Sequence, residues 1–217
     1  MQVDQGQAQL PMRATLTNVN TERCCITRGK LKHSIIPGMG KVDWSFIEKL
    51  HQVQQRCAAN HYYLHIFSFP SKKMKVKLAA QTLSASVASA LSVIRHLWYS
   101  DFTGSECTKF FISTIDRLFD TFHSRSPKAS GFKSPLTLVR LKRVTAFLTR
   151  TKDLLLNMQT TQGIRLCRSK RSMSVLGFAV NIDSLLFLAS NMLLNGKLKY
   201  LLTYKLSQDH LELFSVP

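Results

Sequence analysis

The sequence predicts a mainly α-helical fold in which a helical domain follows an irregular N-terminal segment. In most of the chain after residue 43, apolar residues recur every three or four positions, which is the spacing of one face of a helix. The alternation of apolar and polar residues that is typical of strands is confined to one short stretch, residues 63 to 69. Hydrophobic residues make up 45% of the 217 residues, which is enough for a sizeable core.

Residues 1 to 40 are expected to be irregular, because Gln-rich and Thr/Asn-rich stretches are followed by Pro37, Gly38 and Gly40. A helix is expected over residues 43 to 56, with Asp43 as its N-terminal cap. Residues 73 to 98 carry an apolar stripe that predicts one long helix. The stripe is formed by Val76, Ala79, Leu83, Val87, Leu91, Ile94 and Trp98.

Three further helices are expected in the second half of the chain. Helical spacing of apolar residues covers residues 111 to 122 and 138 to 155, and the Pro- and Gly-containing residues 124 to 135 form the loop between them. Residues 173 to 194 are strongly apolar and end at Asn195 and Gly196. Because this stretch contains Asn181 and Asp183, we expect a buried helix and no membrane span. The second half of residues 198 to 214 is expected to be helical.

The chain is strongly basic, with a formal net charge of +18. Residues 121 to 182 carry 12 of the basic residues and one acidic residue, whereas residues 183 to 217 are neutral overall. This basic block is consistent with a solvated helical face or with a surface that faces the phosphates of a nucleotide or of DNA. Charge alone leaves both interpretations open.

Familiar catalytic and metal-binding motifs are missing from the sequence. There is no glycine-rich phosphate loop, and the five cysteines lack paired zinc-ligand spacing. Their odd number indicates a reducing compartment, the cytosol or nucleus.

Asp209 and Glu212 are three residues apart, so on a helix both carboxylates share one face. They would hold a divalent metal there, or form a capping box in which Asp209 is the cap.

Four segments in the same order resemble the P element transposases, including their THAP-domain-containing vertebrate relatives. They are Val-Asp-Trp-Ser-Phe-Ile-Glu-Lys-Leu at 42 to 50, the segment from Lys73 to Ala88, Phe-Asp-Thr-Phe-His-Ser-Arg at 119 to 125, and the segment from Leu201 to Glu212. The resemblance covers residues 41 to 214. In that family an RNase H-like catalytic domain is interrupted by a helical insertion that binds GTP.

The resemblance implies that residues 41 to 200 are the GTP-binding insertion and residues 201 to 217 a truncated piece of the catalytic domain. It implies that Asp120 and Asp209 face the guanine base, that Phe119 packs against it, and that Lys77 contacts the nucleotide. The nucleotide would be GTP, with Mg²⁺ as its accompanying ion. Glu212 would be the last carboxylate of the catalytic triad, a vestigial catalytic and metal-binding residue.

The sequence departs from the family pattern in two ways. His123 stands where the family has an asparagine, so one amide that offers a donor and an acceptor is replaced by an imidazole. The first two catalytic aspartates would lie upstream of this chain. Because two-metal phosphoryl transfer needs several carboxylates, Glu212 alone does not complete a strand-transfer site.

The leading hypothesis is a transposon-derived fragment that binds a guanine nucleotide and is not an enzyme on its own. It is expected in the nucleus, as a homo-oligomer or in association with a full-length transposase, with DNA bound by residues 121 to 182. The alternative is a basic helical module that binds DNA or protein and no nucleotide. A third hypothesis is an intact transposase whose other segments lie outside this chain.

Overall fold

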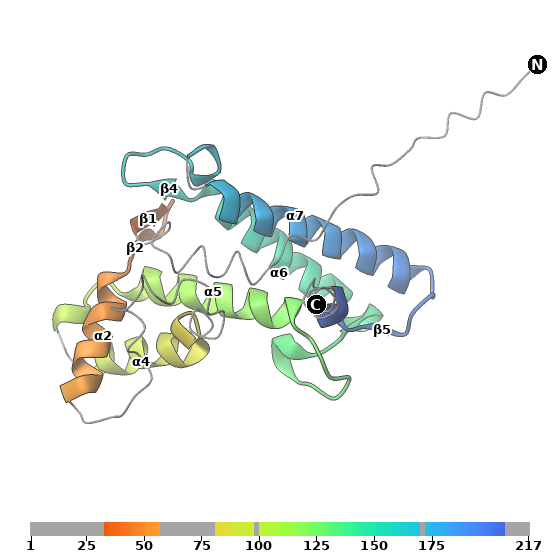
Figure 1. Ribbon diagram of the computed structural model, residues 1–217, viewed down its shortest axis with the longest axis horizontal. Coiled ribbons are helices and arrows are strands. Elements are labelled where there is room, and N and C mark those ends of the chain that lie inside the picture. Colours follow the sequence, from red (N-terminus) through yellow and green to blue (C-terminus); the bar gives the residue numbers. More distant parts are fainter. Residues whose placement is uncertain (1–32, 57–80, 98–99, 170–171, 207–217) are drawn as a thin grey trace, which may run out of the picture.

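The structure is a computed structural model that describes residues 33–56, 81–97, 100–169 and 172–206. Five α-helices dominate this part of the chain, so the predicted fold class is confirmed. They are α2 (Ser45–Arg56), α4 (Ala85–His96), α5 (Glu106–Phe122), α6 (Leu138–Asn157) and α7 (Ser172–Ala189). Figure 1 shows α6 and α7 side by side, with α5 next to α6 and with α2 and α4 at the opposite end of the molecule from β5.

Short strands join segments that lie far apart in the sequence. β1 (His33–Ile36) pairs antiparallel with β2 (Gly40–Asp43) and with β4 (Gln159–Thr160), in the order β2-β1-β4. β3 (Leu136–Thr137) pairs with β5 (Tyr200–Leu201). The strands have only two to four residues, too few for alternation to be recognised in the sequence.

The hairpin of β1 and β2 corrects the expectation that residues 1 to 40 are irregular. Its turn contains Gly38 with φ +77°, a backbone conformation that glycine adopts at no steric cost, so the glycines that suggested a loop instead close a hairpin. Residues 1–32 and the alternating stretch 63 to 69 lie outside the described residues.

The long helix expected over residues 73 to 98 is interrupted. A turn and a bend at Leu83 and Ser84 separate two helical segments, and the Ser84 hydroxyl accepts a hydrogen bond from the Val87 N–H at 3.4 Å. Serine is a favoured N-cap because its side chain satisfies a backbone donor of the first helical turn. The predicted apolar stripe is confirmed where it is described, since Leu83, Val87, Leu91 and Ile94 are buried. Val76, Ala79 and Trp98 lie outside the described residues.

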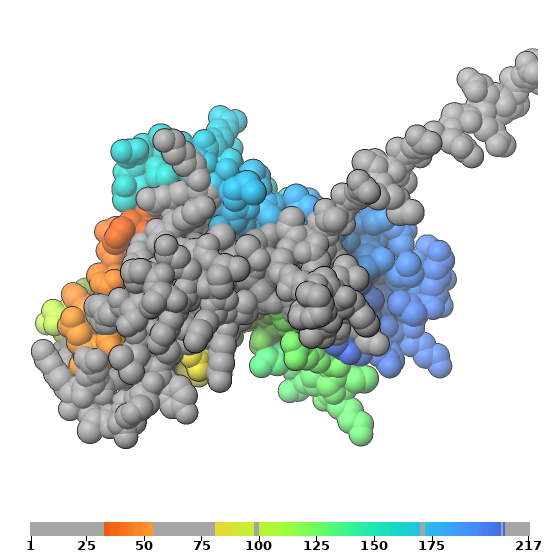
Figure 2. All heavy atoms as spheres, viewed as in Figure 1, coloured from red at the N-terminus to blue at the C-terminus, as the bar shows by residue number. Residues whose placement is uncertain are grey.

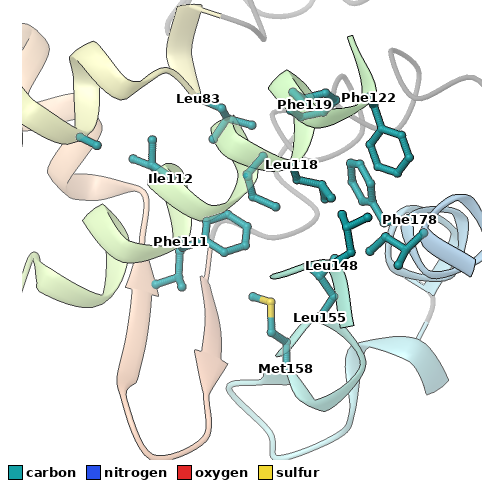
Figure 3. Packing of buried hydrophobic residues seen from close by; sticks show 14 of the residues in the cluster. Leu83, Phe111, Ile112, Leu118, Phe119, Phe122, Leu148, Leu155, Met158 and Phe178 are labelled. Atoms are coloured by element: carbon teal, nitrogen blue, oxygen red, sulfur yellow. The ribbon is translucent and has the colours of Figure 1, made fainter. Parts of the chain in front are cut away.

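The core is built around α5, the helix predicted over residues 111 to 122. Figure 3 shows its side chains Phe111 and Leu118 pointing toward Leu148 and Leu155 of α6. All four are essentially inaccessible to solvent. Burial of a side chain of this size contributes roughly 1.5–3 kcal/mol, so this layer contributes substantially to stability.

Helix α7 is buried on one side only. Val175, Phe178 and Ile182 are buried, whereas Met173 and Phe187 on the opposite side are 71% and 64% exposed. The expectation of a buried helix is therefore correct for one face and wrong for the other. The reason is that the sequence is apolar all round the helix, so no periodicity distinguishes the core face from the outer face. A π-helical turn, η6 (Ser190–Leu194), extends α7 as far as Asn195 and Gly196, the predicted end.

The segment Ser172–Leu194, which combines α7 and η6, is long and apolar enough to cross a membrane by length and composition. Half of its most apolar window is buried inside the described structure. The prediction that no segment spans a membrane stays a prediction.

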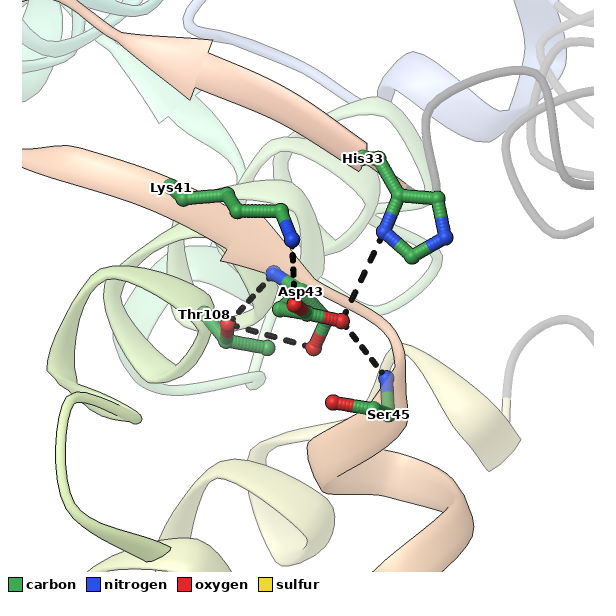
Figure 4. A network of polar contacts seen from close by, with 5 residues as sticks. All are labelled: His33, Lys41, Asp43, Ser45 and Thr108. Atoms are coloured by element: carbon green, nitrogen blue, oxygen red, sulfur yellow. Dashed lines mark hydrogen bonds and ion pairs between the residues drawn. The ribbon is translucent and has the colours of Figure 1, made fainter. Parts of the chain in front are cut away.

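The junction between β2 and α2 is held by a polar network around Asp43 (Figure 4). The Asp43 carboxylate accepts a hydrogen bond from the Ser45 N–H at 3.0 Å, as expected for a cap, and pairs with Lys41 at 2.7 Å and with His33 at 3.5 Å. The Asp43 N–H donates to the Thr108 hydroxyl of α5 at 2.9 Å. Asp43 therefore joins the hairpin, α2 and α5.

This network shifts the pKa of Asp43. Burial by itself raises the pKa, but the hydrogen bonds from Lys41 and the Ser45 amide, together with the charge of Lys41, outweigh burial and lower the pKa from 3.8 to about 2. The carboxylate is therefore stabilised in its charged form in the folded state.

We predict that Asp43→Asn lowers the free energy of unfolding at neutral pH by about 2 kcal/mol. Because the folded-state pKa is depressed, the contribution of Asp43 is fully present above pH 3.8 and is lost as the pH falls through 2. Urea unfolding of the wild type and the variant at several pH values measures the difference. It should shrink as the solution is acidified. Asp153→Asn, which changes an exposed carboxylate on α6, is the control. A pH-independent difference for Asp43→Asn would contradict the prediction.

Candidate functional site

The segment Phe119–Arg125, which resembles the nucleotide-binding motif, forms the C-terminal end of α5 and the start of the following loop. Asp120 lies in the last turn of α5, and its side chain is 30% exposed. Its carboxylate is 3.7 Å from the ammonium group of Lys133 in the turn η4 (Gly131–Lys133). An exposed ion pair of this length is weak, so the carboxylate remains accessible to a ligand.

Phe119 is buried in the described structure, and its expected packing against the base stays a prediction. Its ring is 2% exposed and makes an edge-to-face contact with Phe178 of α7, with ring centroids 5.6 Å apart. Figure 3 shows it at the end of α5 among the buried side chains. In the described structure Phe119 anchors the helix that carries Asp120, and its ring is not on the surface beside that carboxylate.

His123 is the C-terminal cap residue of α5. Its backbone N–H donates to the Phe119 carbonyl at 2.9 Å, and its Nδ1 lies 3.0 Å from the same oxygen. A carbonyl oxygen only accepts, so Nδ1 carries the proton, and in the neutral ring Nε2 is then an acceptor. The side-chain amide of the asparagine that the family has here would offer a donor as well as an acceptor. With Nδ1 bonded to the Phe119 carbonyl, the neutral His123 ring has only the Nε2 acceptor left for a ligand.

A second family segment, residues 201 to 206, packs directly against this helix end. The Thr203 hydroxyl donates to the Thr121 carbonyl at 2.6 Å and accepts the Ser124 N–H at 3.1 Å. The Tyr204 N–H donates to the Ser124 carbonyl at 3.2 Å, and the Arg125 guanidinium lies 5.9 Å from the centre of the Tyr204 ring. Two of the four family segments are therefore in contact although about 80 residues of sequence separate them.

Of the expected nucleotide-binding residues, Phe119, Asp120 and His123 lie within the described structure, at the end of α5. Lys77, Asp209 and Glu212 lie outside the described residues, so their roles stay predictions. Within the described ranges no group of three His, Cys, Asp or Glu side chains is placed to hold a metal ion.

The loop after α5 is fixed by residues that the sequence did not single out for this purpose. The Arg140 guanidinium donates to the carbonyls of Gly131 and Pro135 at 2.6 and 2.9 Å. Phe132 packs against Phe147, with ring centroids 4.9 Å apart, and under the guanidinium of Arg117. In the space-filling view the beginning of this loop (green) projects from the surface (Figure 2). These contacts hold the turn that carries Lys133 next to Asp120.

Two of the basic residues of α6 contact other parts of the structure, and three are exposed. Arg140 holds the loop, and Lys152 pairs with Asp183 of α7 at 2.7 Å. Lys142, Arg143 and Arg150 are exposed and have no ion-pair partner within the part of the chain that the structure describes. Some of the basic residues between positions 121 and 182 therefore hold the fold together. Only the others are exposed without an ion-pair partner in the described structure and so available to a ligand.

Comparison with known proteins identifies the family. Residues 27–135 match the family described as TNP-like, GTP-binding insertion domain. The chain belongs to this family. Over 143 residues, or 65% of its length, the chain is 36% identical to DNA transposase THAP9 of Homo sapiens, and it covers 16% of that protein.

The fold is similar to that of a chain in the Drosophila P element transposase strand transfer complex. The TM-score is 0.76 at 24% sequence identity, over 91% of this chain and 44% of the other. The resemblance to P element transposases that was inferred from four short segments is thus confirmed. The matched residues 27–135 of the TNP-like family include Lys77, Asp120 and His123 and end before α6.

We predict that Arg140→Met lowers the free energy of unfolding by about 1–2 kcal/mol, because two charge-assisted hydrogen bonds to the loop are lost. The matched control is Arg143→Met, which removes an exposed, unpaired guanidinium from the same helix and should change stability by less than about 0.5 kcal/mol. Urea unfolding of the purified chain measures both. Equal effects would show that Arg140 does not hold the loop.

Proposed function

We propose that this chain binds a guanine nucleotide, GTP, at the C-terminal end of α5. The observation that carries the proposal is the position of Asp120, a partly exposed carboxylate in a chain of the TNP-like GTP-binding insertion domain family. A carboxylate accepts hydrogen bonds only, and guanine presents two adjacent N–H donors on one edge. Adenine lacks this pair of donors, so the same carboxylate discriminates against ATP.

The surroundings of Asp120 favour an exchange of partners. Its carboxylate faces the ammonium group of Lys133 at 3.7 Å, an exposed pair of the kind that contributes about 0–1 kcal/mol. Replacement of this contact by two hydrogen bonds to a base therefore costs little. Helix α5 is fixed by the burial of Phe119 and Phe122, so Asp120 is presented from a rigid element.

Asp209, Lys77 and Glu212 complete the proposal. Asp209 follows Leu206 by three residues, a length of chain that spans at most about 11 Å. We assign Asp209 to the base and Lys77 to the phosphates, where Mg²⁺ would also bind. Residues 41 to 200 would form the insertion and residues 201 to 217 part of the catalytic domain. Strand transfer would need more carboxylates than Glu212 alone, so nucleotide binding is the function proposed for this chain by itself.

We predict that isothermal titration of the full chain gives binding of GTP and GDP and at least tenfold weaker binding of ATP. Asp120→Asn should weaken GTP binding by roughly 10- to 100-fold, because a charged acceptor contributes about 1.5–3 kcal/mol. The same variant should gain relative affinity for xanthosine triphosphate, whose base has a carbonyl where guanine has an amino group. Asp153→Asn is the control. Equal affinity for GTP and ATP, or no effect of Asp120→Asn, would contradict the proposal.

DNA is the second partner that we propose, through the exposed face of α6. Lys142, Arg143 and Arg150 are presented to solvent without partners in the described structure, and a cationic face of this kind binds phosphates without reading sequence. If DNA is the partner, the nucleus is the location that we propose for the protein. This function is independent of the nucleotide site and matches the basic-module hypothesis.

We predict that the triple variant Lys142→Gln, Arg143→Gln and Arg150→Gln weakens DNA binding and reduces the slope of log affinity against log salt by about 2.7, since each phosphate contact contributes about 0.9. The control carries Lys109→Gln, Lys197→Gln and Lys199→Gln, which remove the same charge from exposed positions outside α6. Fluorescence anisotropy with a labelled duplex at several salt concentrations measures both. An equal loss of slope in the control would exclude a specific role for α6.

A further inference from the structure

We propose that Ser126, in the exposed loop after α5, is a phosphorylation site for a proline-directed protein kinase, and that the fold withholds a second such serine, Ser134. The sequence contains six prolines, and two of them, Pro127 and Pro135, directly follow a serine. Kinases of this class transfer phosphate to a serine or threonine that is followed by proline. The modification would be independent of the nucleotide and DNA binding proposed above.

Ser126 lies in an exposed stretch of the loop. The four consecutive residues 125 to 128 are exposed, and residues 124 to 126 have neither helical nor strand structure. In the space-filling view this part of the chain (green) projects from the surface (Figure 2). A kinase holds its substrate as an extended segment, and a residue before proline already favours an extended backbone. Ser126 is therefore presented in a form that a kinase can bind.

The turn around Ser126 is held by local and long hydrogen bonds. The Ser126 hydroxyl accepts from the Lys128 N–H at 3.3 Å, and the Ser126 carbonyl accepts from the Ala129 N–H at 3.2 Å. Both distances are at or beyond the long end of the usual range, and both partners lie within three residues of Ser126. The turn can therefore open without any rearrangement of the core.

The second serine, Ser134, is held in the fold by the residues that follow it. Pro135 and Leu136 are buried, and Leu136 pairs with β5. The Arg140 guanidinium donates to the Pro135 carbonyl at 2.9 Å. Extension of the chain around Ser134 in a kinase groove would break these contacts and expose the buried side chains. Ser134 is therefore opened much less often than Ser126, although both precede a proline.

The charges around Ser126 favour a phosphate group. Residues 121 to 135 contain Arg125, Lys128 and Lys133 and no Asp or Glu. A phosphoserine carries a charge of about −1.5 to −2 at neutral pH and is stabilised by neighbouring cations. The Lys128 N–H, which donates to the Ser126 hydroxyl, would donate to a phosphate oxygen as well. The phosphorylated loop is therefore expected to keep its turn.

The reaction needs ATP and the kinase as co-reactants. The Ser126 Oγ attacks the γ-phosphorus of ATP, and an Oγ–P bond forms. The bond from that phosphorus to the oxygen that bridges it to the β-phosphate breaks, and ADP leaves. The hydroxyl proton passes to the catalytic aspartate of the kinase. This chain supplies only the accessible hydroxyl and the segment that the kinase recognises.

The test is incubation of the purified full chain with Mg²⁺-ATP and a cyclin-dependent kinase, which is proline-directed, followed by peptide mass spectrometry to locate the phosphate. We expect phosphate at Ser126, with modification of Ser134 slower by roughly tenfold or more. Ser126→Ala should remove this phosphate. Pro127→Ala keeps the exposed hydroxyl and should slow its modification by roughly tenfold or more, because the kinase selects the proline. Both variants should melt at the same temperature as the wild type, since both positions are exposed.

Arg140→Met tests whether the fold protects Ser134. Loss of the guanidinium frees the Pro135 carbonyl and loosens the end of the loop, so modification of Ser134 should become faster by about threefold or more. The rate at Ser126 should not change, because its turn makes no contact with Arg140 among the hydrogen bonds of the described residues. Arg143→Met, which removes an exposed guanidinium from the same helix, should change neither rate.

Several results would overturn the assignment of Ser126. They are an unmodified Ser126 in the wild type, equal rates at Ser126 and Ser134, and an unchanged rate at Ser126 in Pro127→Ala. If Ser134 reacts no faster in Arg140→Met than in Arg143→Met, the fold does not select between the two serines, and the assignment is overturned as well.

Discussion

The structure depends on the burial of one broad face of α5. Ten of its 17 residues are buried, including Phe111, Ile115 and Leu118. The opposite face, which carries Lys109, Ser113 and Arg117, is exposed or partly exposed, so α5 supports the core through a single wide face. The other elements attach to it through specific contacts. Thr108 bonds to Asp43 at the hairpin, Phe119 packs on α7, and Thr121 accepts the hydroxyl of Thr203.

The burial of this face explains why the end of α5 is suited to carry the binding residue that we propose there. A helix that is fixed over five turns cannot shift its last turn without disturbing the core. Some residues of the segment Phe119–Arg125 fix the helix in the core, and one remains accessible to solvent. Phe119 and Phe122 hold the helix, and Ser124 joins it to the segment after β5, whereas Asp120 remains partly exposed. In this arrangement a single carboxylate is presented by a rigid support, which is the condition for selective recognition of a base.

The sequence predicted the helices well and the strands poorly, and each result has a physical reason. Helices α5 and α6 contain several turns, so their apolar period was recognisable, whereas strands of two to four residues contain no period. The break at Ser84 was missed because the apolar stripe continues through it, from Leu83 to Val87. Asp120 was singled out only through the family resemblance, and its role stays a prediction. Thr203 and Lys133 were not found, because their partners are distant in the sequence and no local pattern records such a contact.

The basic residues of α6 also fall into two groups, those that make contacts within the fold and those that are exposed. Arg140 donates to two loop carbonyls and Lys152 is paired with Asp183, so neither is available to bind phosphate without a loss of stability. Net charge therefore overestimates the cationic surface of residues 121 to 182. Of the five basic residues on α6, those that remain unpaired in the described structure are Lys142, Arg143 and Arg150. A partner that recognises this helix would meet three cations along one element, and its affinity would follow these three residues and not the total charge of the chain.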